Sequence, residues 1–151
     1  MTVTGASGPE APHHGGTPVR AASGGRPRSA RSGRAVARAA AADAAAVLAF
    51  VVAGRSSHDE TNALAGIATT AWPFLVALGA GWLVLRTWRS PLQLWPTAVL
   101  LWLVTVAGGL GLRLVSGQGA SGAFPLVAAG VLALLLIGWR LVAWAILRRR
   151  P

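Results

Sequence analysis

The segment "AFPLVAAGVLALLLIGWRLVAWAIL", residues 123–147, decides the fold of this chain. It contains a single charged residue, Arg140, in a stretch longer than the roughly 20 residues that a helix needs to cross about 30 Å of hydrocarbon. Pro125 stands in its first turn, where a missing backbone N–H is harmless because first-turn N–H groups have no helical partner. The segment therefore predicts a transmembrane helix.

Three more apolar segments precede it, at residues 37–57, 64–85 and 94–114, the last with Pro96 in its first turn. The connections "HDETNA", "RTWRSPLQ" and "SGQGASG" are short, and short connections make consecutive helices antiparallel neighbours. The prediction is an all-α, polytopic membrane protein. Its domain, residues 37–147, consists of four transmembrane helices in an antiparallel bundle.

The two ends of the chain are basic. Residues 1–36 are rich in Gly, Ser, Pro and Arg, lack the apolar surface that ordering requires, and are predicted to be a disordered tail. Residues 148–151 form a short basic C-terminal end. A secretory signal cleaved near "VVAG" is the alternative interpretation of the first apolar segment. Against it, the basic region is too long for a signal and Asp43 interrupts the apolar run.

Composition indicates where this protein resides. It is 54% hydrophobic and 12% charged, and most of its 14 Arg residues cluster at the two chain ends, so the net charge of +10 favours membrane orientation over nucleic-acid binding. The connection at 86–93 adds two Arg residues to the same side, which predicts a multi-pass plasma-membrane protein with both termini in the cytoplasm. The absence of Cys excludes disulfides and thiolate chemistry.

Two ionisable residues lie inside predicted spans, and a charge in a bilayer needs a partner or a role. Asp43 lies near the cytoplasmic end of the first helix, and Arg140 lies at similar depth in the fourth. One interpretation is a structural ion pair that fixes the first helix against the fourth. In another, Arg140 extends to the interface and Asp43 stays near water. The third is a proton or substrate site.

A second polar group surrounds "GRSSHDETN" on the outer side. Arg55 and His58 end the first helix and Arg113 ends the third, so we expect one cluster, with Asp59 or Glu60 as counter-charge. Such a cluster would either hold the first and third helices together or receive an anionic ligand or lipid head group from outside. A lone His near two adjacent carboxylates predicts no metal site.

The second helix contains Pro73, which removes a backbone hydrogen bond and predicts a kink. We expect Thr69 and Thr70 to satisfy a freed carbonyl. Small residues, Ala77, Ala80 and Gly81 here and "AGGLG" in the third helix, predict close helix packing.

Together, the acidic residue in the first helix, "GRSSH" at its end, "WPF", "TVAGGLGLR" and "GWR" resemble a bacterial and archaeal membrane family, domain of unknown function 3054. The resemblance covers residues 40 to about 142 and implies a four-helix membrane protein without specifying an activity. Its most specific positions are Asp43, Gly54-Arg55, His58, Pro73-Phe74, Arg113 and Arg140.

The sequence therefore leaves more than one class of function open. A structural or interaction role in the bilayer, with a homo-oligomer as one form, is one hypothesis. A small ion- or proton-coupled transporter using Asp43 and the outer Arg/His cluster is the alternative. The chain offers no Cys, no pair of buried His residues and no Ser with a nearby base, so we expect neither an enzyme nor a cofactor.

Overall fold

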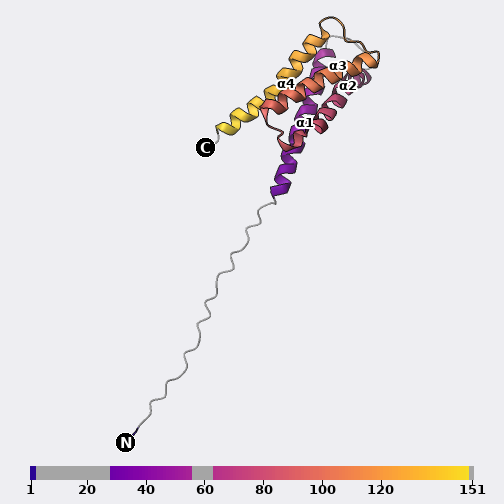
Figure 1. Cartoon of the computed structure of the whole chain (residues 1–151). Helices are drawn as coiled ribbons and strands as arrows, with labels where there is room; N and C mark the ends of the chain where they lie inside the picture. The colour runs from indigo at the N-terminus through magenta and orange to yellow at the C-terminus, as the bar shows by residue number, and fades with distance from the viewer. Residues whose placement is uncertain (3–27, 56–62, 150–151) are drawn as a thin grey trace.

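The computed structural model describes residues 1–2, 28–55 and 63–149, and the described part is helical (Figure 1). Four helices are long and apolar enough to cross a membrane, as predicted. They are α1 (Arg28–Arg55), α2 (Ala63–Val84), α3 (Val99–Val115) taken together with the turn before it as the span Leu94–Val115, and α4 (Phe124–Arg148). The 3-10 turn η1 (Thr87–Arg89) and the wide turn η2 (Leu94–Ala98) lie between α2 and α3.

The helices form a bundle in which α2 and α4 each contact both α1 and α3. Within the described residues α1 and α3 therefore occupy diagonal positions, and the α2–α3 interface is the most extensive. We call one end of the bundle the Arg113 end, where α1 and α3 finish and α2 and α4 begin. The opposite end, where α2 and α4 finish, is the Arg140 end.

Two helix starts differ from the predicted ones. Helix α1 begins at Arg28, nine residues before the predicted start at residue 37, and so includes residues 28–36. These residues follow the last N-terminal proline, Pro27, and are mostly Ala, Arg and Ser, which continue a helix at low cost. The regular helix α3 begins only at Val99, because Trp95 is extended (φ −114°, ψ 129°), the conformation that a following proline imposes.

Pro73 lies buried inside α2, which remains one helix from end to end. The expected role of Thr69 is wrong. Its hydroxyl donates to the Ala65 carbonyl at 2.8 Å, whereas the carbonyl that Pro73 leaves without an N–H donor is that of Thr69 itself. Helix α2 therefore accommodates Pro73 without a hydrogen bond from the Thr69 hydroxyl to the carbonyl that lacks its N–H donor.

Three phenylalanines, one from each of α1, α2 and α4, form the centre of the core. The Phe50 and Phe74 rings meet edge to face at 5.4 Å between centroids, and Phe124 lies 6.3 and 6.4 Å from them. Gly109 of α3 packs directly against the Phe74 ring, where a Cβ atom would overlap the ring carbons. This close approach places the α3 end, and with it Arg113, against the aromatic core.

Candidate functional site

Asp43 of α1 and Arg140 of α4 form a buried ion pair at the Arg140 end. Arg140 Nη1 lies 2.6 Å from Asp43 Oδ1 and Nη2 lies 2.7 Å from Oδ2, and both side chains are 0% exposed. Two parallel charge-assisted hydrogen bonds fix the pair in one geometry. The structure thus brings the two residues together, and the interpretation that Arg140 extends to the membrane interface is wrong.

Two indole groups complete the hydrogen bonding of the carboxylate. Trp82 of α2 donates from Nε1 to Asp43 Oδ2 at 3.0 Å, and Trp139 of α4 donates to Oδ1 at 2.9 Å. Each carboxylate oxygen therefore accepts one guanidinium and one indole hydrogen bond. The Arg140 guanidinium carbon also lies 4.5 Å from the Trp139 ring centroid, a cation–π contact.

Arg140 uses its other donors on backbone carbonyls. Its Nε donates to the Pro91 carbonyl at 2.9 Å, and Nη1 also donates to the Leu136 carbonyl at 2.8 Å. Pro91 belongs to the α2–α3 connection, in which Arg86 adopts a left-handed conformation (φ 50°). We call Asp43, Arg140, Trp82, Trp139 and the Pro91 carbonyl the Asp43 network; it joins α1, α2, α4 and this connection.

Sequence reasoning missed three members of the network: Trp82, Trp139 and Pro91. A usable signal was present, because an indole N–H inside a membrane needs an acceptor and Asp43 is the one acidic side chain within the predicted spans. Trp139 directly precedes Arg140, and Trp82 lies near the end of α2, at the level of the pair. The Pro91 carbonyl carried no comparable signal, because any backbone carbonyl can accept a hydrogen bond.

Arg113, in the last turn of α3, binds the connection that follows it. Its Nε donates to the Gly119 carbonyl at 3.1 Å, Nη1 to Gln118 Oε1 at 3.0 Å and Nη2 to the Gln118 carbonyl at 3.4 Å. The guanidinium carbon lies 4.5 Å from the centroid of the Phe124 ring. All three acceptors are neutral oxygens, so these contacts orient the cation without neutralising it.

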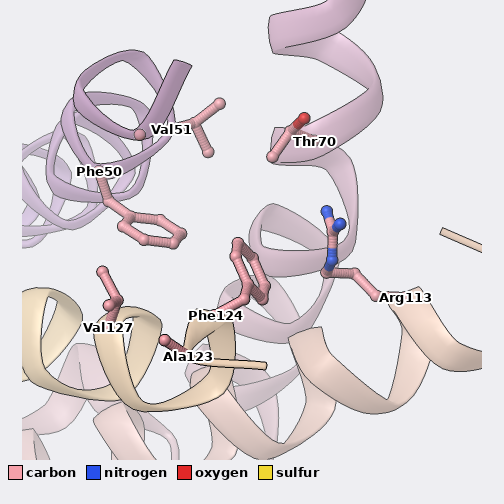
Figure 2. Close-up of a pocket in the computed structure, with 8 residues that line it drawn as sticks. Phe50, Val51, Thr70, Arg113, Ala123, Phe124 and Val127 are labelled. Carbon is pink, nitrogen blue, oxygen red and sulfur yellow. The ribbon is translucent and has the colours of Figure 1, made fainter. Parts of the chain in front are cut away.

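A cavity of about 370 Å³ opens beside this guanidinium. Figure 2 shows Arg113 next to the Phe124 ring, with Phe50 and Val51 across the space and Thr70 above it. All four helices contribute to the lining, which is mainly apolar. The remaining lining residues are Gly54, Ala123 and Val127.

The expected outer cluster is only partly within the described structure. Gly54, the neighbour of Arg55, lines the same cavity as Arg113, so the ends of α1 and α3 do meet around one space. The Arg55 side chain, His58, Asp59 and Glu60 lie outside the described part of the chain, and the cluster stays a prediction. Across the ranges that are described, no group of three His, Asp or Glu side chains could hold a metal ion.

Residues 40–143 match the model of a family described as "Protein of unknown function (DUF3054)". The chain belongs to this family. The matched range contains the whole Asp43 network and the Arg113 cavity, so both polar sites lie inside the DUF3054 domain. Neither a curated protein nor a solved structure matches the chain. The DUF3054 description states no activity, and a function has to be argued from these two sites.

Proposed function

We propose that this DUF3054 protein is a non-enzymatic binding protein of the plasma membrane whose Arg113 cavity takes an amphiphile with an oxyanion head group. The observation that carries the proposal is a guanidinium, bound only to neutral oxygens in the described structure, at the side of a mainly apolar cavity. An oxyanion there would add a charged acceptor to the charged donor, an attraction that the neutral oxygens around Arg113 do not provide.

The lining supports an amphiphile over a bare anion. Phe50, Val51, Phe124 and Val127 present apolar surface to the space next to Arg113. The volume of about 370 Å³ falls within the range of about 300–1,000 Å³ typical of small-molecule sites. A chain or ring among these residues would add hydrophobic contact that a free phosphate or chloride ion lacks.

Orientation is part of the proposal. The arginine asymmetry of the sequence supports cytoplasmic termini, which would place the Arg113 end on the outer side of the plasma membrane. The amphiphile would then reach the cavity from the outer leaflet. A homo-oligomer is compatible with this arrangement, and the binding role does not require one.

The alternative of an Asp43-coupled transporter is less well supported by the geometry. A proton carrier has to exchange its proton with water, whereas both oxygens of Asp43 are buried and each accepts two hydrogen bonds. We therefore assign the Asp43 network a structural role within the proposal.

Binding of dodecyl phosphate to the protein in phosphatidylcholine nanodiscs tests the proposal, with empty nanodiscs correcting for partition. We expect saturable binding that Arg113→Gln weakens about tenfold or more, because a hydrogen bond to a charged group is worth about 1.5–3 kcal/mol. Arg89→Gln, at the opposite end and exposed, is the matched control and should bind as wild type does.

Inorganic phosphate and dodecanol test the contributions of the charged head group and the apolar chain separately. Both should bind far more weakly than dodecyl phosphate, since each lacks either the chain or the charge. Equal binding by wild type and by a folded Arg113→Gln protein would contradict the proposal, and equal affinity for inorganic phosphate would show that the apolar lining is not used.

A further inference from the structure

The connection between α3 and α4 curls around Arg113 through its own backbone. The Ser116 and Gln118 amides donate to the Leu112 and Arg113 carbonyls, both at 2.9 Å. Gly117 and Gly119 adopt left-handed conformations (φ 72° each), which residues with a side chain rarely do. The backbone carbonyls that contact the guanidinium are therefore held in place by the fold of the connection itself.

Of the three oxygens that accept hydrogen bonds from Arg113, one belongs to a side chain and two to the backbone. The Gln118 and Gly119 carbonyls belong to this backbone, whereas Gln118 Oε1 sits on a side chain with three rotatable bonds. The side chain can leave Nη1 without any change in the connection. An arriving oxygen atom could take the same position, 3.0 Å from Nη1, while the two backbone carbonyls keep the guanidinium oriented.

We propose that the Gln118 carboxamide is a built-in competitor for the oxyanion at Arg113 and sets the affinity of the cavity. This inference rests on the proposed binding function. A neutral amide is the weaker acceptor for a guanidinium, so a charged ligand displaces it and an uncharged one does not. Gln118 would therefore add selectivity for anions at a cost in affinity.

Two substitutions of Gln118 should move binding of dodecyl phosphate in opposite directions. Gln118→Ala removes the competitor and should tighten binding about threefold to tenfold, the worth of one net hydrogen bond. Gln118→Glu supplies a fixed carboxylate at the same position and should weaken binding about tenfold or more. Ser121→Ala, exposed in the same connection, is the matched control and should leave binding unchanged.

A second measurement needs no amphiphile. Phenylglyoxal modifies accessible guanidinium groups, and mass spectrometry reports its rate at Arg113. That rate should rise in Gln118→Ala and fall in Gln118→Glu relative to wild type.

The outcomes separate the two proposals. If wild type binds dodecyl phosphate but both Gln118 variants shift the affinity in one direction, or not at all, the competitor role is wrong and the binding function stands. If neither wild type nor Gln118→Ala binds, the binding function fails and the competitor role fails with it. Unchanged phenylglyoxal rates in the variants would also overturn the competitor role.

Discussion

Each oxygen of Asp43 accepts one hydrogen bond from Arg140 and one from an indole N–H. Burying an ion pair is expensive, and the attraction offsets that expense only when the geometry is good and the remaining lone pairs are satisfied. Trp82 and Trp139 provide that satisfaction. The arrangement thus explains at the residue scale how every oxygen lone pair facing a donor is used when a carboxylate lies inside an apolar bundle.

Removing either charge from this pair should destabilise the protein strongly. Asp43→Asn and Arg140→Gln should each lower the free energy of unfolding by about 3–5 kcal/mol, because each leaves a buried charge without its partner. The double variant should lose less than the sum of the single losses. Unfolding of the purified protein in detergent measures all three against Arg89→Gln, an exposed arginine whose loss should cost less than about 1 kcal/mol. Strictly additive losses would show that the pair contributes no coupling energy.

At the scale of elements, small residues allow α2 and α3 to pack closely. A Cβ atom on Gly108 would lie 3.0 Å from the Ala77 Cβ, and one on Gly81 would lie 2.8 Å from Leu101 Cδ1. Ala77 and Gly81 thus behave as the predicted small-residue stripe, whereas Ala80 is exposed and does not belong to it. Gly109, which was not distinguished from its neighbours in "AGGLG", faces the buried Phe74 ring.

Alanine substitutions in α3 test this interface. Gly109→Ala should lower the free energy of unfolding by about 1–3 kcal/mol, because the added methyl group overlaps the Phe74 ring and forces the helices apart. Gly111→Ala is the matched control: it lies two positions away on the same helix, and a Cβ atom there meets nothing within 4 Å. Thermal unfolding of both variants in the same detergent gives the comparison. If the two variants were equally stable, the contact between Gly109 and Phe74 would not limit how closely α2 and α3 pack.

At the scale of the whole molecule, the four spans and their connections set which end of the bundle faces the cytoplasm. Reporter fusions after residues 60, 90, 119 and 151 should read outside, inside, outside and inside, because arginines concentrate at the chain ends and in the 86–93 connection. Alkaline phosphatase and green fluorescent protein fusions at the same positions give complementary readouts. An extracytoplasmic C-terminus, or cleavage of the chain near Ala53, would contradict this topology.

The sequence by itself determined the number, order and approximate length of the spans. Hydropathy and length are local properties, and a segment such as residues 123–147 must cover the hydrocarbon thickness whatever its neighbours do. The two exceptions, the start of α1 at Arg28 and the late start of regular helix at Val99, are ends, where a few residues shift a boundary without changing the fold. Asp43, Arg113 and Arg140 were also recognisable, because charges stand out in apolar segments.

Only the tertiary structure decided what those charges touch. The contacts of Asp43 with Trp82 and Trp139 depend on how three helices are rotated about their axes, and that rotation follows from side-chain packing across the bundle. The Pro91 carbonyl reaches Arg140 because the connection after α2 folds back over the bundle end. The Arg113 cavity likewise exists only where all four helices converge, since no single segment contains enough of its lining to form it.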